Sequence, residues 1–502
     1  MIKKIKSALI SVFNKDGLEE IVKLLNKHSV KIISTGGTAE FIRKLGVEVT
    51  LVEELTEYPS LFEGRVKTLH PKIAGGILKI RGNKVHEEEA KKYDIPEIDL
   101  VVSNLYPFEN TVASGAAEEK IIEDIDIGGI SLIREASKNF KDVVIISSAD
   151  QYEEFKKMLE KGAETTLEER KKFAGAGFET TSLYDSAIRE YFQGTKLRYG
   201  ENPHQRASFV GNLLESFEQL HGKELSYNNL IDTEAAIAVV YDFDKPAFAI
   251  IKHMNACGLA VREEGKLLEA YQAAYDADPV SAFGGILAAN RTVSKEIAEL
   301  IKEQKLFVEV IIAPSFSEEA LAILREKKDC RILRYRNPKL PERMIQTSFT
   351  GFLIQDRDTH VESEKNLTVV TKRKPTEQEK KDLLMATVAT KHLKSNSIAL
   401  TKDGTLISMG CGQTSRIDAL KQAIEKFTRI AKLGGAKNPS LSGAVMSSEA
   451  FFPFPDCVEL AAKAGVSAVI HPGGSKNDQA STDMADRFNM AMVTTGFRHF
   501  KH

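Results

Sequence analysis

The sequence is poor in cysteine, and its charges almost cancel. Four cysteines stand far apart in 502 residues and form no C-x-x-C pair, so neither a zinc site nor a disulfide framework is expected. Free thiols favour a reducing compartment, which predicts a cytoplasmic protein. The 69 Lys and Arg residues against 71 Asp and Glu give a net charge of −2, which offers no general attraction to nucleic acid. No apolar run has membrane-spanning length and no secretory signal is present, so no membrane association is expected.

The chain also lacks the glycine-rich signatures of common nucleotide-binding folds. It contains no Walker loop and no G-x-G-x-x-G, so neither a nucleoside triphosphate nor a dinucleotide is implied. What it does contain is an alternation of strand-like and helix-like patterns. Apolar runs at 7–12, 30–34, 47–52, 99–103 and 143–147 predict strands, and the spacing of apolar residues at 18–28 and 39–45 predicts helices. This alternation predicts an α/β fold with a mostly parallel sheet covered on both faces.

The length of the chain predicts two or three domains, because 502 residues exceed one comfortable core. A helical region at 166–192 is expected to end the first domain, and the short polar segment 193–196 places the boundary near residue 195. A second polar junction bearing a proline lies around residues 372–376. A helix at 377–391 and strands at 397–401 and 405–409 are predicted after it. No short-period repeat is visible, although the two C-terminal portions can still be structurally related halves.

Two predicted strands of the N-terminal domain end in small and hydroxyl residues. Ser11-Val12-Phe13-Asn14-Lys15 follows the first strand, and Ser34-Thr35-Gly36-Gly37-Thr38 follows the second. Backbone N–H groups, hydroxyls and a nearby helix N-terminus together form a natural phosphate site. A tight turn explains the two glycines equally well, so the motif alone leaves both interpretations open.

A denser group of polar residues lies in Gly64-Arg65-Val66-Lys67-Thr68-Leu69-His70-Pro71. A single cation is usually a solvated surface residue. Two cations, a hydroxyl and an imidazole within six positions favour a binding or catalytic site instead.

Two later segments of this domain are ambiguous when each is taken alone. Tyr106 follows a predicted strand and by itself is better explained as a half-buried core residue. Asp126 precedes Gly128 and Gly129, where it fits either a site carboxylate or the N-cap of a helix. Lys138, further along that helix, is either a site cation or an exposed lysine.

The most informative segments lie after residue 195. Arg198-Tyr199-Gly200-Glu201-Asn202-Pro203-His204-Gln205 gathers groups that can clamp a phosphate and stack on a heterocycle. Lys252-His253 follows the apolar run 247–251, at the carboxyl end of a strand, where α/β folds place chemistry. An ammonium group beside an imidazole favours the neutral imidazole that a general base requires. The two side chains reach one site only if they lie in a loop beyond the strand, and an isolated Lys-His pair is more often a surface lysine beside a packed histidine.

Other candidates carry a weaker signal. Cys257 is better explained as a buried free thiol than as a nucleophile. Phe283, Phe451 and Phe452 are either core residues or rings that stack on a flat cofactor. The segment containing Asn396 adds amide and hydroxyl groups, and Arg498 is a final cation.

In this order, the segments closely resemble the bifunctional family that combines phosphoribosylaminoimidazolecarboxamide (AICAR) formyltransferase with inosine monophosphate (IMP) cyclohydrolase. The resemblance covers essentially all 502 residues. It implies a methylglyoxal-synthase-like domain at 1–195 that carries the cyclohydrolase. It also implies a formyltransferase region at 196–502, built from two cytidine-deaminase-like subdomains at about 196–372 and 373–502 that lack zinc. The absence of H-x-E with P-C-x-x-C agrees with the loss of metal.

The resemblance also assigns roles to individual residues. In the cyclohydrolase, the positions that match the family's catalytic set are Lys67, Thr68, Tyr106, Asp126 and Lys138. The positions that match its nucleotide contacts are Ser11, Lys15, Ser34, Gly36, Gly37, Thr38 and Arg65. The implied reaction closes the ring of formyl-AICAR with loss of water. An amide nitrogen is a poor nucleophile, so it needs one group to accept its proton and another to stabilise charge on the formyl oxygen.

In the formyltransferase, Lys252 and His253 match the catalytic pair and Asn396 matches the residue that bonds the transferring formyl group. The AICAR-binding positions are matched by Arg198, Tyr199 and Arg498, an acidic position by Glu309, and aromatic positions near the folate by Phe283, Phe451 and Phe452. The resemblance implies 10-formyltetrahydrofolate as co-substrate, no required metal, and a homodimer whose transferase sites are shared between subunits. Because the AICAR amine is weakly nucleophilic, positioning of the two substrates should supply much of the acceleration.

Two positions depart from the family's pattern. Phe13 stands where many members have serine, which puts one hydroxyl contact in doubt, and Ala256 replaces a common proline, so that loop is expected to be less rigid. Two alternative functions remain at this point. An effector-binding regulatory protein would not need Lys252 and His253 together with Asn396, and a metal-dependent nucleotide deaminase is opposed by the missing zinc ligands.

Overall fold

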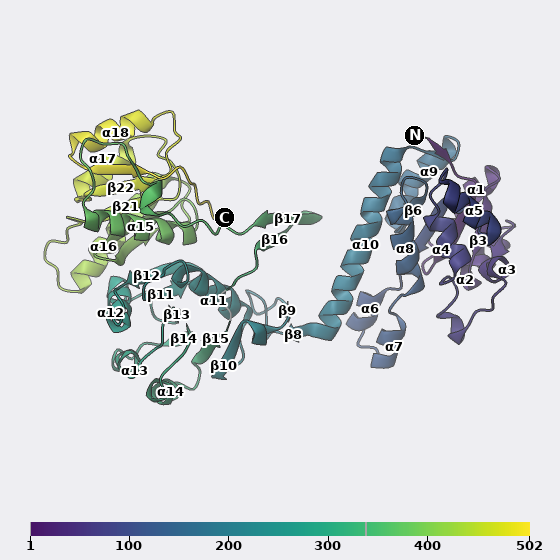
Figure 1. Cartoon of the computed structure of the whole chain (residues 1–502). Coiled ribbons are helices and arrows are strands. Elements are labelled where there is room, and N and C mark those ends of the chain that lie inside the picture. Colours follow the sequence, from purple (N-terminus) through teal and green to yellow (C-terminus); the bar gives the residue numbers. More distant parts are fainter. Residues whose placement is uncertain (1, 337–338) are drawn as a thin grey trace. The chain divides into compact units, whose positions relative to one another are not determined.

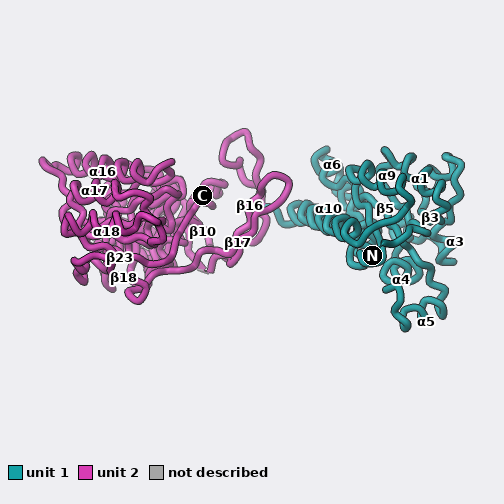
Figure 2. The backbone as a smooth tube through the Cα atoms, turned by 90° about the horizontal axis from the view of Figure 1, so that it is seen from above, with its two compact units in different colours: residues 1–194 teal, residues 195–502 magenta. Residues whose placement is uncertain are grey.

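The structure is a computed structural model that describes residues 2–336 and 339–502. The chain forms two compact units, Met1–Gly194 (unit 1) and Thr195–His502 (unit 2), shown in different colours in Figure 2. No described helix combines the length and the apolarity that a bilayer crossing requires.

Unit 1 contains a five-stranded sheet in which every pairing is parallel. Its order is β4-β3-β2-β5-β6, with bounds β2 (Ser7–Val12), β3 (Lys31–Ser34), β4 (Thr50–Leu51), β5 (Leu100–Asn104) and β6 (Val144–Ile146). A separate antiparallel pair joins β1 (Lys3–Lys4) to β7 (Glu164–Thr165). The predicted strand at 47–52 is reduced to the two residues of β4, because Val52 already begins a helix.

Helices connect the strands of unit 1 (Figure 1). Their bounds are α1 (Leu18–Lys27), α2 (Gly36–Lys44), α3 (Val52–Thr56), α4 (Pro71–Leu78), α5 (Lys84–Lys92), α6 (Phe108–Ala113), α7 (Glu118–Glu123), α8 (Gly128–Lys138), α9 (Tyr152–Glu160) and α10 (Leu167–Gln193). α10 begins with a capping box between Thr166 and Glu169, the sequence signal of a helix start.

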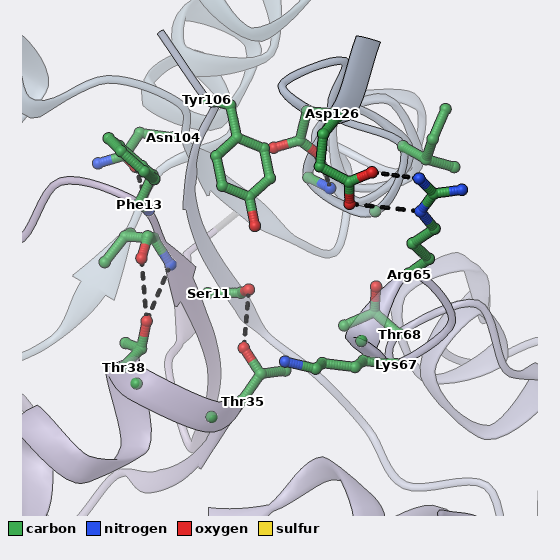
Figure 3. Close-up of a pocket in the computed structure, with 18 of the residues that line it drawn as sticks. Ser11, Phe13, Thr35, Thr38, Arg65, Lys67, Thr68, Asn104, Tyr106 and Asp126 are labelled. Carbon is green, nitrogen blue, oxygen red and sulfur yellow. Dashed lines mark hydrogen bonds and ion pairs between the residues drawn. The ribbon is translucent and has the colours of Figure 1, made fainter. Parts of the chain in front are cut away.

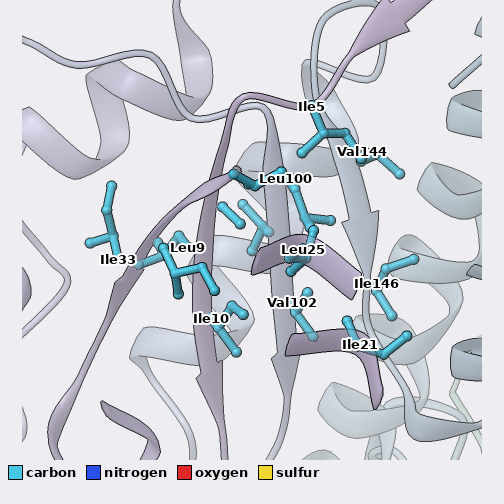
Figure 4. Close-up of a cluster of buried hydrophobic side chains, with 14 of the residues drawn as sticks. Ile5, Leu9, Ile10, Ile21, Leu25, Ile33, Leu100, Val102, Val144 and Ile146 are labelled. Atoms are coloured by element: carbon cyan, nitrogen blue, oxygen red, sulfur yellow. The ribbon is translucent and has the colours of Figure 1, made fainter. Parts of the chain in front are cut away.

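The central strand β2 explains why this sheet is covered on both faces. Ala8, Leu9 and Ile10 are consecutive, so their side chains alternate between the faces, yet all three are fully buried. Figure 4 shows Leu9 and Ile10 amid side chains from β3, β5, β6 and α1. The prediction of an α/β unit with a buried parallel sheet is confirmed.

Unit 2 is built around one mixed sheet of twelve strands among the described residues. The first six in spatial order are β10-β15-β14-β13-β11-β12, and the next six are β20-β19-β21-β22-β23-β18. The two sets meet where Ala260 of β12 pairs with Thr405 of β20. In each set three strands pair in parallel, and the remaining pairings are antiparallel.

The chain order of elements is the same in the two halves of this sheet. The first half runs β10 (Phe217–His221), α11 (Tyr227–Val240), β11 (Ala247–Lys252), β12 (Asn255–Val261), α12 (Leu267–Ala277), β13 (Gly285–Ala289), α13 (Lys295–Glu303), β14 (Val308–Ala313), α14 (Glu318–Leu324) and β15 (Arg331–Tyr335). The second half runs β18 (Thr368–Val369), α15 (Glu377–His392), β19 (Ile398–Lys402), β20 (Thr405–Gly410), α16 (Arg416–Leu433), β21 (Val445–Ser448), α17 (Asp456–Ala464), β22 (Ala468–His471), α18 (Asp478–Arg487) and β23 (Ala491–Thr494). Unit 2 is therefore an internal duplication, and its second half begins at β18, ahead of residue 373.

Two short antiparallel pairs lie outside this sheet. One joins β8 (Gly194–Lys196) to β9 (Ser208–Val210). The other is the hairpin of β16 (Arg343–Ser348) and β17 (Gly351–Asp356), which follows the first half and precedes the second. The strands of this hairpin pair only with each other.

Candidate active sites

A cavity of about 720 Å³ lies at the carboxyl edge of the parallel sheet of unit 1. The strand order reverses at β2, since β3 and β4 lie on one side and β5 and β6 on the other. In open α/β sheets ligands bind at such a switch point. The residues that follow β2, β3 and β5 line the cavity together with residues 63–68 and 122–129 (Figure 3).

Ten of the twelve cyclohydrolase residues predicted from the sequence line this cavity. They are Ser11, Lys15, Gly36, Gly37, Thr38, Arg65, Lys67, Thr68, Tyr106 and Asp126. Ser34 does not reach it, because this residue is fully buried and its hydroxyl donates to the carbonyl of Ile10 at 2.6 Å. Lys138 does not line it either and stands exposed in the last turn of α8, the helix whose first residues border the cavity.

Two helices begin at the cavity wall and present their amino ends to it. α2 starts at Gly36, and the side chain of its N-cap residue Thr35 makes no capping bond. The Thr35 hydroxyl instead lies 3.0 Å from that of Ser11. α8 starts at Gly128, and the carboxylate of Asp126 already occupies its amino end by accepting the N–H of Gly129 at 2.6 Å. The N-terminus of α2 has no such cap and favours an anion, so this end of the cavity suits a phosphate.

Three cations border the same space. The ammonium of Lys67 approaches Gly36, where a Cβ atom would lie only 3.3 Å from the lysine nitrogen, and Gly36 also has a φ of +37°. Glycine at this position therefore leaves room for the lysine as well as for the turn. Arg65 forms an ion pair with Glu123, and Lys15 lies on the loop after β2.

Tyr106 and Asp126 form the acid–base part of the cavity. Asp126 is held by the N–H of Gly129, which donates to its carboxylate at 2.6 Å. Burial raises the pKa of Asp126, although N–H bonds from Gly129, Tyr106 and Ile130 oppose the rise. Burial and the charge of Asp126 raise the pKa of Tyr106. A carboxyl with a raised pKa is a stronger base at neutral pH than an ordinary one.

Asn104 also lines the cavity, although the sequence analysis assigned it no role. Its side-chain oxygen accepts the N–H groups of Phe13 at 2.6 Å and Asn14 at 3.1 Å, and its nitrogen donates to the carbonyl of Asn14 at 2.7 Å. These bonds tie the loop after β2 to the end of β5. The available signal was its position as the last residue of a buried strand.

In unit 2 the predicted transferase residues Lys252 and His253 lie at the turn between β11 and β12. Lys252 donates to the carbonyl of Phe283 at 2.7 Å, which joins the turn to the predicted folate-contacting segment. Phe283 is 61% exposed, and the centroid of its ring lies 5.4 Å from that of Phe307. This exposed ring is accessible to a ligand.

Hydrogen bonds connect this turn to the segment 394–396, which carries Asn396 and is remote in sequence. Asn255 donates to the carbonyl of His253 at 2.8 Å and accepts the N–H of Lys394 at 3.3 Å. Asn396 follows a cis peptide bond after Ser395, and its side chain donates to the carbonyl of Gln413 at 3.0 Å. The Lys252–His253 turn and the segment 394–396 that carries Asn396 therefore form one cluster, joined through the bond between Asn255 and Lys394.

The C-terminal segment, residues 498–501, is bonded to the segment that carries Asn396. Ser395 donates its N–H to the carbonyl of Lys501 at 2.9 Å, and its hydroxyl accepts the N–H of Lys501 at 3.1 Å. His499 lies between the carboxylates of Asp358 at 2.6 Å and Glu362 at 2.8 Å. Arg498, which adjoins His499, is exposed and stacks over the Phe500 ring at 4.3 Å.

The remaining predicted transferase residues contact neighbours other than the Lys252–His253 turn and the segment 394–396. Arg198 donates to the hydroxyl of Tyr199 at 2.8 Å and lies over its ring, so these two residues form a pair of their own. Glu309 forms an ion pair with Arg331 at 2.7 Å. Phe451 is partly exposed, whereas Phe452 is fully buried against His471 and is a core residue, so its ring is not free to stack on a folate.

No three His, Cys, Asp or Glu side chains of residues 2–336 and 339–502 are grouped in a way that could hold a metal ion.

Comparison with known proteins identifies the family. The sequence profile of the AICARFT/IMPCHase bienzyme family matches residues 136–426, and that of the MGS-like domain matches residues 17–131. A protein of Bacteroides thetaiotaomicron named bifunctional purine biosynthesis protein PurH is 51% identical and covers 100% of this chain and 99% of its own length. This chain belongs to the AICARFT/IMPCHase bienzyme family. It is accordingly an enzyme of purine biosynthesis with AICAR formyltransferase and IMP cyclohydrolase activities, as the resemblance predicted.

Two further proteins resemble this chain over different lengths. The protein of the same name from Rhodospirillum rubrum is 45% identical and covers 99% of each chain. A solved structure titled "Crystal structure of ForH" is 32% identical to this chain. The match covers 37% of this chain and 96% of the other, with a TM-score of 0.33. Because the chain belongs to this enzyme family, the alternative function of a regulatory binding protein is wrong.

Proposed function

We propose that the two activities of this family member are divided between its two units, with ring closure in the cavity of unit 1 and formyl transfer at the Lys252–His253 cluster of unit 2. The observation that carries the proposal is the cavity itself. It combines the uncapped N-terminus of α2 and three cations with a buried carboxyl next to a phenol. These groups suit a phosphorylated substrate whose chemistry is proton transfer.

In ring closure, the phosphate of formyl-AICAR binds at the amino end of α2. Lys67 stabilises the negative charge that develops on the formyl oxygen when the carboxamide nitrogen attacks the formyl carbon. Asp126, with the neighbouring Tyr106, accepts the proton that the nitrogen loses, and its raised pKa suits this role. The formyl oxygen takes up this proton and the one that the formamide nitrogen loses, and it leaves as water while a C=N bond completes the ring of IMP. Thr68 lies against the first turn of α8, where a Cβ on Gly128 would meet its hydroxyl at 2.9 Å, so it is placed to orient the substrate at that helix.

In formyl transfer, the donor is 10-formyltetrahydrofolate and the acceptor is the 5-amino group of AICAR. A carbon–nitrogen bond forms between that amine and the formyl carbon, and the bond from the formyl carbon to the folate nitrogen breaks. His253 removes the proton from the amine, and the folate nitrogen gains one as it leaves. Lys252 and Asn396 stabilise the formyl oxygen, while Phe283 and Phe451 offer partly exposed rings to the folate.

We further propose that the working form is a homodimer in the cytoplasm. The β16–β17 hairpin exposes Ile345 by 66%, Leu353 by 61% and Ile354 by 60%. A lone two-stranded hairpin with exposed apolar side chains is poorly stable in water, so a second copy is the expected cover. The double variant I345D/L353D should be monomeric by light scattering, while Q346D, at a polar position of the same strand, should remain dimeric. A monomeric unaltered protein would refute the dimer. All four cysteines are free thiols, in keeping with a reducing compartment.

One assay tests the division of labour. The enzyme is supplied with AICAR and 10-formyltetrahydrofolate, and the release of tetrahydrofolate and of IMP is followed separately. The proposal expects variants at the unit 2 cluster to stop release of tetrahydrofolate while supplied formyl-AICAR is still converted to IMP. Loss of both reactions from one such change, in a folded protein, would contradict separate sites.

A further inference from the structure

The turn that carries His253 has an unusual backbone. Lys252 pairs with Asn255, so His253 and Met254 form a two-residue loop between β11 and β12. Their φ angles are +50° and +63°. Positive φ at both loop residues defines a type I′ turn, which strongly favours Asn or Asp followed by Gly. Residues other than glycine are uncommon at positive φ, and although histidine enters this region more often than most, methionine does not, so other contacts have to hold the turn.

Asp232 of α11 supplies such a contact. The N–H of Met254 donates to its carboxylate at 2.7 Å, and the N–H of His253 also bonds it. Burial raises the pKa of Asp232, whereas these backbone bonds and the charges of His253 and Lys252 lower it. A carboxylate that accepts two backbone N–H groups makes charge-assisted bonds, which are stronger than neutral ones.

The second half of the sheet contains the same device. Lys402 pairs with Thr405, and Asp403 and Gly404 between them have φ angles of +51° and +66°. Asp382 of α15 accepts the N–H of Asp403 at 3.0 Å and that of Gly404 at 2.7 Å. An aspartate on a helix therefore holds a two-residue turn in each half.

The spacing of the device is identical in the two halves. The helix N-cap, the aspartate and the lysine before the turn stand at 226, 232 and 252 in the first half and at 376, 382 and 402 in the second. The strand register also shifts at the same place, between 250 and 251 and between 400 and 401. The halves differ in the turn itself. The second has Asp-Gly, which adopts this turn readily, whereas the first has His-Met, which does not.

We propose that Asp232 is a positioning residue of the formyl-transfer site, whose carboxylate holds the His253–Met254 turn so that the imidazole of His253 faces the substrates. This inference rests on the proposed role of His253. Asp382 has the same structural role in a turn that carries no catalytic group. The duplicated half therefore provides a matched control within the same chain.

The test compares D232A with D382A in the full-length enzyme. D232A is expected to lower kcat for formyl transfer about 10- to 100-fold, because small displacements of a catalytic group have effects of this size. KM for AICAR should change less than about threefold, since Asp232 contacts the turn and not the ligand. D382A should lower the thermal midpoint comparably while kcat stays near that of the unaltered enzyme. If the two variants reduce kcat equally, Asp232 is only structural and the inference is wrong.

A rescue experiment separates turn geometry from any other role of Asp232. Glycine adopts positive φ without strain, so M254G in the D232A background should restore a clear part of the lost kcat. Absence of any restoration would overturn the inference. If D232A is insoluble, D232N replaces it, because an amide oxygen still accepts one N–H and should give an intermediate loss. H253A keeps the two hypotheses apart: if H253A retains transfer, the proposed function fails, but if only H253A loses transfer and D232A does not, this inference alone fails.

Discussion

The cavity of unit 1 is assembled at the ends of parallel strands, whereas the cluster of unit 2 surrounds a turn between two antiparallel strands. In unit 1 the reversal of strand order at β2 opens a space, and helix N-termini and side chains border it. In unit 2 the catalytic candidates project from a two-residue loop. Their placement depends on bonds from α11, from residues 394–396 and from the C-terminal segment. The parallel sheet of unit 1 therefore creates a site through its topology, whereas the site at the antiparallel β11–β12 turn of unit 2 relies on contacts between remote segments.

The largest effect is expected at His253, where one substitution should separate the activities of the two units. H253A should reduce formyl transfer by about 10²- to 10⁴-fold, the usual contribution of a general acid or base. Cyclisation of supplied formyl-AICAR should be unchanged, because the cavity of unit 1 is built from residues 11–129. The two rates are measured separately on the same preparation. Impaired cyclisation in a folded variant would mean that the sites are not independent.

The converse change is made at Lys67. K67A should slow cyclisation by about 10²- to 10³-fold, the cost of losing a group that stabilises an oxyanion. Formyl transfer should be retained, as judged by release of tetrahydrofolate. K157A removes an exposed lysine of α9 that does not line the cavity and serves as the control. Equal losses from both variants would point to a general effect of charge.

The dependence of unit 2 on its C-terminal segment can be tested through pH. Burial alone lowers the pKa of His499, but its hydrogen bonds to Asp358 and Glu362 outweigh burial and raise the pKa to about 9. The folded-state pKa lies above the ordinary histidine value of 6.5, so the stabilisation is complete below about pH 6.5 and is lost as the pH rises through 9. H499Q should cost about 3–5 kcal/mol at pH 6, because it leaves the buried carboxylate of Glu362 without its charged partner.

The measurement is urea unfolding of both proteins at pH values between 6 and 9.5. The unaltered protein should lose stability over this range, and H499Q should lose much less, so that the two curves converge at high pH. Curves that stay parallel would show that the ion cluster does not stabilise this segment.

The smallest effect is expected at Phe13, where the sequence departs from its family. Its ring lies 5.2 Å from that of Tyr106 in an edge-on arrangement. An aromatic pair of this kind contributes about 0.5–1.5 kcal/mol, so F13S should change the rate of cyclisation by no more than about tenfold. Formyl transfer provides the internal control. A loss above about 100-fold would show that Phe13 has a larger role than support of Tyr106.

Local sequence predicted the architecture of unit 1, and the resemblance to the family named most of the residues that line its cavity. Alternating apolar runs specify buried parallel strands, and the named residues stand at element ends: Ser11 near the end of β2, Gly36 just after β3 and Asp126 just before α8. The carboxyl ends of neighbouring parallel strands must meet at one edge, so residues placed there by sequence come together in space. The short β4 was mispredicted because apolar content alone does not separate a strand end from a helix start.

For unit 2 the sequence by itself predicted which residues carry the chemistry, through the resemblance to the family, but only tertiary structure decided what holds them in place. Asn255 bonds Lys394, Ser395 bonds Lys501, and Asp232 bonds the His253 turn across long stretches of chain. No local periodicity encodes such contacts, because they arise when the strands of the mixed sheet pair. The fold likewise decided that Phe452 is core and that unit 2 is a duplication, since burial and strand order are properties of packing rather than of residue type.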